Sequence, residues 1–140
     1  MERRTLPEKL IAADELLWMP EPEFWRTELV QGRIIREPPA YYDHGNSVTR
    51  IVIRSGSYVE AHRLGQVVTA NAGFLLFRNP DTVRAPDVAF VVRERLAQRV
   101  PRKFFPGHPD LAVEVGVPTD TMREMIAKML DYLRAGTRMA

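Results

Sequence analysis

The sequence contains no cysteine among its 140 residues. This absence excludes disulfide bonds, thiolate metal sites and a cysteine nucleophile, so any chemistry must use oxygen or nitrogen groups. No apolar run approaches the length of about 20 residues that a membrane-spanning helix needs. The first ten residues, MERRTLPEKL, carry charges without the apolar core of a signal peptide. These features predict a cytoplasmic protein with no membrane partner.

Net charge and lysine content are both low. The formal net charge of +2 permits binding to nucleic acid but does not by itself argue for it. Of the 20 basic residues, the lysines are Lys9, Lys103 and Lys128, so arginine is the usual basic residue of this chain. A compact ammonium differs from a planar guanidinium in shape and hydration, so the choice of lysine can have a chemical reason.

Length and patterning predict one domain with an α/β fold. A chain of 140 residues can bury one core but not two. We expect an N-terminal helix region in residues 1–20 and a core in residues 21–140, with a mixed sheet of about five strands flanked by helices. The predicted elements are a helix at 11–19, a hairpin at 27–36 with its turn at Gln31-Gly32, a helix at 44–62, and strands at 65–69, 74–77 and 84–92.

The predicted strand at residues 111–115 contains an acidic residue at a buried position. Residues 111–115 read as a short strand buried on both faces, and a helix follows at 121–134. Glu114 stands in this strand among Leu, Ala and Val. Burial of an ionised carboxylate there costs roughly several kcal/mol unless the carboxylate is paired or binds a metal. A salt bridge to an arginine and a metal site are both open at this point.

Lys128 lies just past the edge of the apolar face of the predicted helix at 121–134, next to Tyr132. Its stem can run along apolar surface and bring the ammonium towards the sheet. The alternative is an i, i+4 pair with Glu124 on a solvated helix face, worth a few tenths of a kcal/mol.

Two further acids stand at element ends. Asp87 follows Pro86 at the start of the predicted strand 84–92, where it can share a divalent cation with an acid of a neighbouring strand, although Pro-Asp is also ordinary turn chemistry. Glu28 lies beside the hairpin turn, where an ion pair with Arg33 or Arg36 is the simpler interpretation.

A basic segment precedes the strand of Glu114. Such a cluster can hold the phosphate backbone of a nucleic acid, and a solvated loop is the alternative. Its members are Arg93, Arg95, Arg99, Arg102 and Lys103.

Three segments in order, APDVAFV, PDLAVEV and PTDTMREMIAKMLDYLRAG, closely resemble the Uma-two family of bacterial restriction endonucleases, which belongs to the PD-(D/E)xK nuclease superfamily. The resemblance extends over residues 10–138. It implies a restriction-endonuclease-like fold and a metal-dependent nuclease that hydrolyses phosphodiester bonds in DNA, with Mg²⁺ or Mn²⁺ as cofactor.

The resemblance also implies roles for individual residues. Asp87 and Glu114 match the metal ligands and, with Lys128, the catalytic set. Gly116 stands where the superfamily usually keeps a strand lysine, which implies that this lysine is displaced to Lys128. Glu28 matches a helper acid, because family members carry a Glu-Leu-Val-x-Gly segment here.

The end of the sequence departs from the family. Members continue into another strand after the Ala-Gly-x-Arg segment, whereas this sequence stops at Ala140. We therefore expect the last family strand to be missing and a sheet edge to be exposed, which favours aggregation or pairing into a homodimer. Two other functions stay open: a catalytically inactive nuclease-fold module that binds DNA or a protein partner, and a hydrolase acting on another phosphoester.

Overall fold

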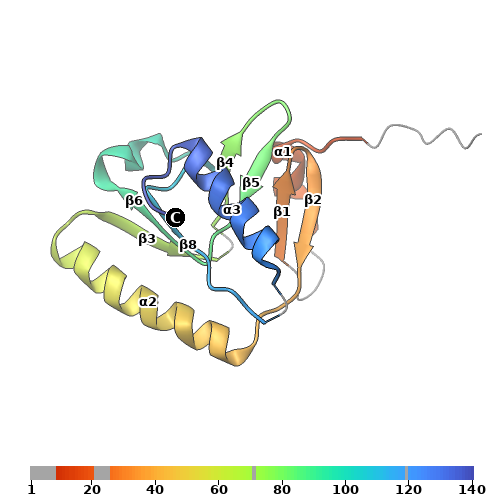
Figure 1. The fold of residues 1–140 in the computed structure, drawn as a ribbon. Coiled ribbons are helices and arrows are strands. Elements are labelled where there is room, and N and C mark those ends of the chain that lie inside the picture. The colour runs from red at the N-terminus through yellow and green to blue at the C-terminus, as the bar shows by residue number, and fades with distance from the viewer. Residues whose placement is uncertain (1–8, 21–25, 71, 119) are drawn as a thin grey trace, which may run out of the picture.

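The computed structural model describes residues 9–20, 26–70, 72–118 and 120–140. Residues 1–8 and 21–25, which include the start of the predicted core, therefore lie outside the described residues. Figure 1 shows the arrangement of the helices and strands. In chain order these are α1 (Ala13–Trp18), β1 (Arg26–Val30), β2 (Arg33–Glu37), α2 (Tyr42–Ala61), β3 (Gly65–Thr69), β4 (Phe74–Phe77), β5 (Thr82–Arg84), β6 (Val88–Val92), the 3-10 helix η1 (Arg93–Gln98), β7 (Phe105–Pro106), β8 (Leu111–Val113) and α3 (Met122–Ala135).

The strands form two sheets. The larger sheet is mixed and has five strands in the order β2-β1-β5-β4-β7, with β4 and β7 parallel. The smaller sheet is antiparallel and has the order β3-β6-β8. The predicted α/β class and the five-stranded mixed sheet are confirmed. The second sheet is an addition that the sequence patterns do not predict.

The segment 84–92, predicted as one strand, is divided between the two sheets. β5 ends at Arg84 in the larger sheet, and β6 begins at Val88 in the smaller one. Pro86 lies between them and has no N–H to give to a strand ladder, so it suits the break. The prediction of one continuous strand is wrong, and the break places Asp87 at the junction of the two sheets.

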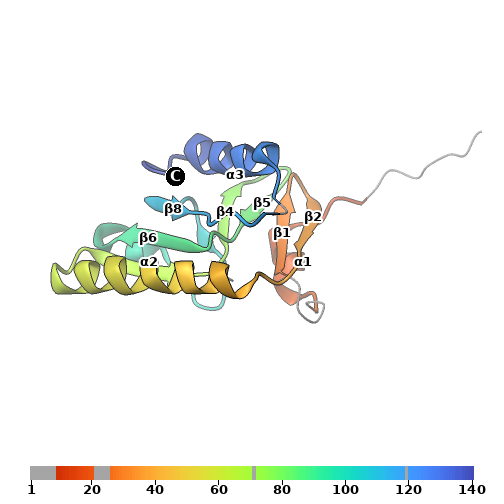
Figure 2. The same cartoon turned by 60° about the horizontal axis from the view of Figure 1, so that its bottom comes forward.

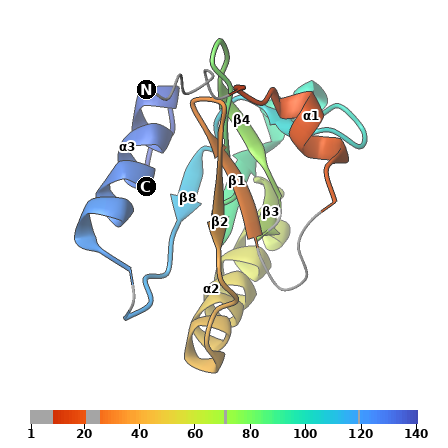
Figure 3. The same cartoon turned by 90° about the vertical axis from the view of Figure 1, so that its right-hand side faces the viewer.

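Helices cover both sheets. Figure 2 shows α2, the smaller sheet and α3 as successive layers. α2 contacts β3 and β6, and α3 also contacts β4 of the larger sheet. Figure 3 shows α3 and α1 on opposite sides of the β1–β2 hairpin. None of the described helices is long and apolar enough to cross a bilayer.

Two apolar clusters form the core. The first lies beneath α3 and joins the two sheets; its buried members are Phe74, Leu76, Ala89, Val91, Ala112 and Tyr132. The second joins α1 to the larger sheet; its buried members are Ala13, Leu16, Leu29 and Val83.

The ends of α3 are fixed by local signals. The Thr121 hydroxyl accepts the Glu124 N–H at 3.2 Å, and the Glu124 carboxylate accepts the Thr121 N–H at 3.0 Å, which is a capping box. Gly136 ends the helix with a φ of 115°. A Cβ at this position would lie 2.8 Å from Nε2 of His108. The helix that carries Lys128 is therefore fixed at both ends.

The end of the chain lies along the edge of the smaller sheet. Met139 forms a parallel bridge with Leu111, and the Ala112 N–H donates to the Met139 carbonyl at 3.0 Å. This contact covers part of the edge of β8. The sequence predicts an exposed sheet edge without indicating which strand forms it.

Candidate active site

The register of β6 and β8 brings Asp87 and Glu114 together. Val88 pairs with Val113, and the two acids occupy the next position beyond this pair. The Val115 N–H donates to Oδ2 of Asp87 at 2.8 Å and closes the end of the ladder. Asp87 is 1% exposed and the Glu114 side chain is 3% exposed. Two buried carboxylates therefore lie at neighbouring positions, as the sequence predicts.

Asp87 is ionised and surrounded by donors. Arg26 donates through Nη1 to Oδ1 at 2.9 Å, and Nε2 of His44 lies 3.2 Å from Oδ2. Burial alone raises the pKa of Asp87, but the hydrogen bond from the Val115 N–H and the charge of Arg26 outweigh it. The pKa of this carboxyl consequently lies below its usual range.

Among the residues that the structure describes, Glu114 has fewer hydrogen-bond donors around its carboxyl group than Asp87 has. The Tyr132 hydroxyl donates to Oε1 at 2.7 Å, whereas Oε2 has Nζ of Lys128 at 3.9 Å. No residue of the described ranges donates a hydrogen bond to this second oxygen. Burial raises the pKa of Glu114 to about 8, because Lys128 and Tyr132 offset the loss of water only in part.

Lys128 reaches the site from α3. Its ammonium contacts Oε1 of Glu37, and its side chain is 13% exposed. Burial alone lowers the pKa of Lys128, but the surrounding carboxylates, led by Glu28 and Glu114, outweigh it and raise the pKa. The ammonium therefore stays charged. The alternative hydrogen-bonded pair with Glu124 is not formed, since the Glu124 carboxylate accepts from Thr121 instead.

The β1–β2 hairpin supplies two residues that the sequence analysis missed. Arg26 stands opposite Glu37 in the hairpin register, and its Nη2 donates to Oε2 of Glu37 at 2.8 Å. The guanidinium thus bridges Asp87 and Glu37, and Glu37 in turn bridges Arg26 and Lys128. The result is a chain of alternating acidic and basic side chains along one wall of the site: Asp87, Arg26, Glu37, Lys128 and Glu114.

His44 is a third missed residue. The sequence indicates a helix-start residue, and His44 does lie in the first turn of α2. Its contact with Asp87 depends on how α2 docks on the smaller sheet, which no local pattern reveals. The Gln31-Gly32 turn does predict that Arg26 faces Glu37, but it does not say what the open end of the hairpin approaches.

Glu28 takes part in a buried ion pair beside the site. It is 2% exposed and accepts from Nη1 of Arg84 at 2.8 Å and from the Ala85 N–H at 2.9 Å. Arg84 also donates to Asp131 at 2.8 Å. The predicted ion pair therefore exists, but with Arg84 rather than Arg33 or Arg36. Both oxygens of Glu28 are occupied, and its charge contributes to the raised pKa of Glu114.

These groups line an open pocket of about 570 Å³. Asp87, Glu114 and Lys128 all contribute to its walls. Residues 38–41, between β2 and α2, form another part of its wall.

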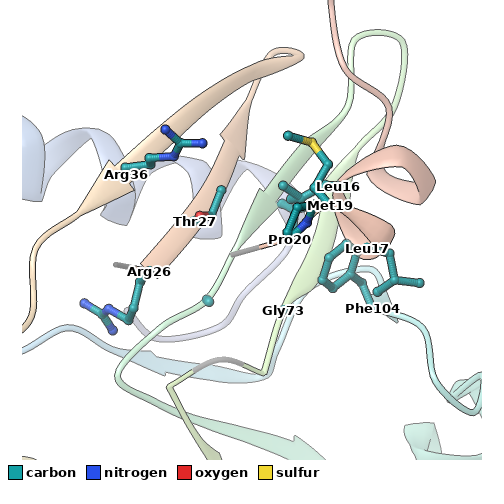
Figure 4. Close-up of a pocket in the computed structure, with 11 residues that line it drawn as sticks. Leu16, Leu17, Met19, Pro20, Arg26, Thr27, Arg36, Gly73 and Phe104 are labelled. Carbon is teal, nitrogen blue, oxygen red and sulfur yellow. The ribbon is translucent and has the colours of Figure 1, made fainter. Parts of the chain in front are cut away.

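A smaller pocket of about 140 Å³ lies between α1 and the larger sheet. Figure 4 shows Leu16, Leu17 and Met19 from the region of α1 together with Phe104. None of the described residues that line this pocket is acidic. The carboxylate chemistry therefore belongs to the larger pocket.

The basic segment predicted to contact phosphates lies elsewhere. It begins where β6 ends, whereas Asp87 precedes the start of β6, so the two stand at opposite ends of this strand. Three of its cations already have acidic partners. Arg95 binds Asp110 at 3.1 Å, Lys103 binds Asp14 at 3.3 Å, and Arg93 lies 3.9 Å from Glu94.

The donor chemistry of the larger pocket suits a hard divalent cation. Mg²⁺ is commonly held by one or two carboxylates and keeps several waters. Asp87 and Glu114 provide two carboxylates, and Oε2 of Glu114 accepts no hydrogen bond from the described residues. No cluster of three or more potential ligands occurs in the described part of the chain, so water would complete the coordination. Binding at Oδ1 of Asp87 requires that Arg26 release this oxygen.

Comparison with known proteins identifies the family of this chain. The Uma2 family, described as "Putative restriction endonuclease", matches residues 13–140. The chain belongs to the Uma2 family. This match covers both sheets and all three residues of the expected catalytic set.

A solved structure shares the fold of this Uma2 chain. It is a crystal structure of a protein from Anabaena variabilis that is described as a putative nuclease belonging to DUF820. The likeness has a TM-score of 0.74 at 23% sequence identity and covers 91% of this chain and 70% of the other. Comparison with curated proteins gives no match.

Proposed function

We propose that the larger pocket is the active site of a metal-dependent nuclease that hydrolyses phosphodiester bonds in DNA. The observation that carries this proposal is the convergence of Asp87, Glu114 and Lys128 from three separate elements. They come from the entry to β6, the exit of β8 and the middle of α3. The membership of the Uma2 family supports the same reaction class.

In this proposal Asp87 and Glu114 hold Mg²⁺ or Mn²⁺. A bound cation would lower the pKa of a coordinated water and would neutralise charge on the phosphate. Asp87 is already ionised, whereas Glu114 would have to release its proton to hold a cation. Both carboxylates stand at the ends of adjacent strands. The backbone of the smaller sheet therefore fixes the position at which a cation would bind.

Lys128 is the third residue of the proposed catalytic set. Its ammonium is charged and lies beside the carboxylate pair, so it can orient the attacking water or stabilise the negative charge that develops on the phosphate oxygens. Arg26 is a second cation at this position. Once it leaves Asp87, its Nη1 is free to donate to a phosphate oxygen, a pairing that suits a guanidinium.

DNA is the proposed partner, and phosphate contacts extend beyond the pocket. Arg93, Arg95, Arg99, Arg102 and Lys103 remain candidates for phosphates distant from the cleaved bond, because they lie at the far end of β6. A homodimer would bring two pockets to one duplex and remains part of the proposal.

The experiment is a plasmid-nicking assay with purified protein, with Mg²⁺ and with EDTA. The wild type is compared with Asp87→Asn and Glu114→Gln, which keep the side-chain shapes. Glu60→Gln serves as the matched control, since Glu60 is an exposed acid on α2. The proposal expects Mg²⁺-dependent nicking by the wild type and the control and a loss of at least about 100-fold in the two pocket variants. Equal nicking by all four proteins contradicts it.

A second candidate function follows from one observation. Both oxygens of Asp87 are already bonded, to Arg26, to Val115 and to His44. This arrangement also suits a catalytically inactive nuclease-fold module in which Arg26 replaces the cation. Such a module binds DNA or a protein partner but neither nicks the plasmid nor binds Mn²⁺.

A further inference from the structure

Glu37 occupies a central position that the proposed function does not use. It is the last residue of β2, and its side chain is 20% exposed at the edge of the pocket. Each carboxylate oxygen faces a different cation. Oε2 accepts from Nη2 of Arg26 at 2.8 Å, and Oε1 contacts the ammonium of Lys128.

The contact with Glu37 determines where the ammonium of Lys128 rests. Lysine carries its charge on a flexible four-carbon stem, so its position depends on the partner that it finds. Two acids compete for it in this pocket. Glu37 accepts its hydrogen bond, whereas Oε2 of Glu114 lies 3.9 Å away, beyond hydrogen-bond distance.

This competition matters for cation binding. Oε2 of Glu114 is the oxygen to which no described residue donates a hydrogen bond. If Glu37 did not hold the ammonium, Lys128 would gain most by moving the short remaining distance onto Glu114, because an unpaired buried ammonium is costly. The ammonium would then occupy the oxygen that a divalent cation needs.

We propose that Glu37 is a positioning residue that holds Lys128 away from Glu114 and so keeps Oε2 of Glu114 open to the divalent cation. This inference rests on the proposed function, because it presupposes a cation between Asp87 and Glu114. It assigns to the β1–β2 hairpin a part in preparing the site. A lysine that arrives from a helix needs such a restraint, because its helix does not fix the ammonium.

The test is a double-mutant cycle read out by calorimetric titration of the full chain with Mn²⁺, without DNA. Glu37→Gln removes the charge that attracts Lys128 and keeps the shape of the side chain. Lys128→Met removes the ammonium. We expect Glu37→Gln to weaken Mn²⁺ binding by about tenfold, as expected when a charge-assisted contact is redirected. Lys128→Met should then strengthen binding by roughly threefold or more in the Glu37→Gln background relative to the wild-type background, because the ammonium lies on Oε2 of Glu114 only when Glu37 no longer holds it.

The matched control is Glu124→Gln, which removes another negative charge near Lys128. Glu124 is exposed and lines the same pocket, and glutamine keeps the capping box. Its effect on Mn²⁺ affinity should combine additively with that of Lys128→Met. This control distinguishes the effect on Mn²⁺ affinity of losing any negative charge in the pocket from the effect of losing the contact between Glu37 and Lys128.

The outcomes are distinguishable from failure of the proposed function. If the wild type binds Mn²⁺ and Asp87→Asn does not, the cation site stands. In that case additive effects of Glu37→Gln and Lys128→Met, or unchanged binding in Glu37→Gln, overturn the role of Glu37 alone. If the wild type binds no Mn²⁺, the proposed function and this inference both fail.

Discussion

The ammonium of Lys128 lies 3.9 Å from Oε2 of Glu114, although one residue belongs to α3 and the other follows β8. The resemblance seen in the sequence implies a strand lysine at the position of Gly116. In this structure the amine beside Glu114 comes from the helix instead.

Lys128→Met should lower the rate of DNA nicking by about 100-fold while leaving the fold intact, because it removes one charged group from the reaction. Adding Gly116→Lys to this variant should restore part of the activity. A Cβ at Gly116 has its nearest neighbours at 3.7 Å and 3.9 Å, which is ordinary contact. Nicking assays on the three proteins check this. Gly116→Ala is the control, and a double variant no better than Lys128→Met contradicts the assignment.

Arg26 competes with a cation for Asp87. Arg26→Met should strengthen Mn²⁺ binding by about tenfold, because the cation no longer displaces a charged hydrogen bond of roughly 1.5–3 kcal/mol. The same variant should nick DNA no faster, since it also loses a phosphate donor. Calorimetric titration measures the affinity. Arg36→Met is the matched control, because Arg36 lines the same pocket and removes an equal charge. If Mn²⁺ affinity rises equally in Arg26→Met and Arg36→Met, the gain comes from the loss of positive charge near the pocket and not from the release of Asp87.

The raised pKa of Glu114 predicts how stability depends on pH in the absence of metal ions. The folded protein keeps this carboxyl protonated up to a pKa of about 8, whereas the unfolded chain releases the proton near 4.5. Between these values the folded state binds more protons, so the free energy of unfolding falls as the pH rises and levels off above about 8. Burial is the main cause of this shift.

Urea denaturation in EDTA at several pH values between these limits measures this slope. Glu114→Gln cannot titrate at this position, so its free energy of unfolding should fall less over the same range. Identical slopes for the wild type and Glu114→Gln would show that the carboxyl is ionised throughout.

The pair of Glu28 and Arg84 should dominate the stability of the sheet junction. Arg84→Met leaves the buried charge of Glu28 without its counter-ion and should cost about 3–5 kcal/mol in the free energy of unfolding. The double variant Arg84→Met with Glu28→Gln should recover a large part of this loss. Arg78→Met is the control, since Arg78 is exposed and should change stability by no more than about 0.5 kcal/mol. Equal effects of Arg84→Met and Arg78→Met in urea denaturation would contradict this account.

Local signals in the sequence predict local structure well here. Gln31 and Gly32 have φ angles of 49° and 77°, as the two-residue hairpin turn requires. The predicted helix at 121–134 agrees with α3 because Thr121, Glu124 and Gly136 form ordinary capping signals. The buried acids are also predictable, since Asp87 and Glu114 stand alone among apolar neighbours.

Contacts between elements are less predictable. The patterns join residues 84–92 into one strand, because they cannot show that its two halves belong to different sheets. The partner of Glu28 is Arg84 of β5, which is distant in sequence, rather than an arginine of its own hairpin. Arg26, Glu37 and His44 have unremarkable local surroundings, and tertiary docking alone brings them to the carboxylates.

Anomalous scattering from crystals grown with Mn²⁺ would show whether Asp87 and Glu114 share a cation. We expect a peak between Asp87 and Glu114, at about 2.1 Å from one oxygen of each carboxylate, as hard cations require. We also expect Arg26 to have left Oδ1 of Asp87. A map at saturating Mn²⁺ with no peak at this position, and with Arg26 still bonded to Asp87, would contradict the proposed cation site.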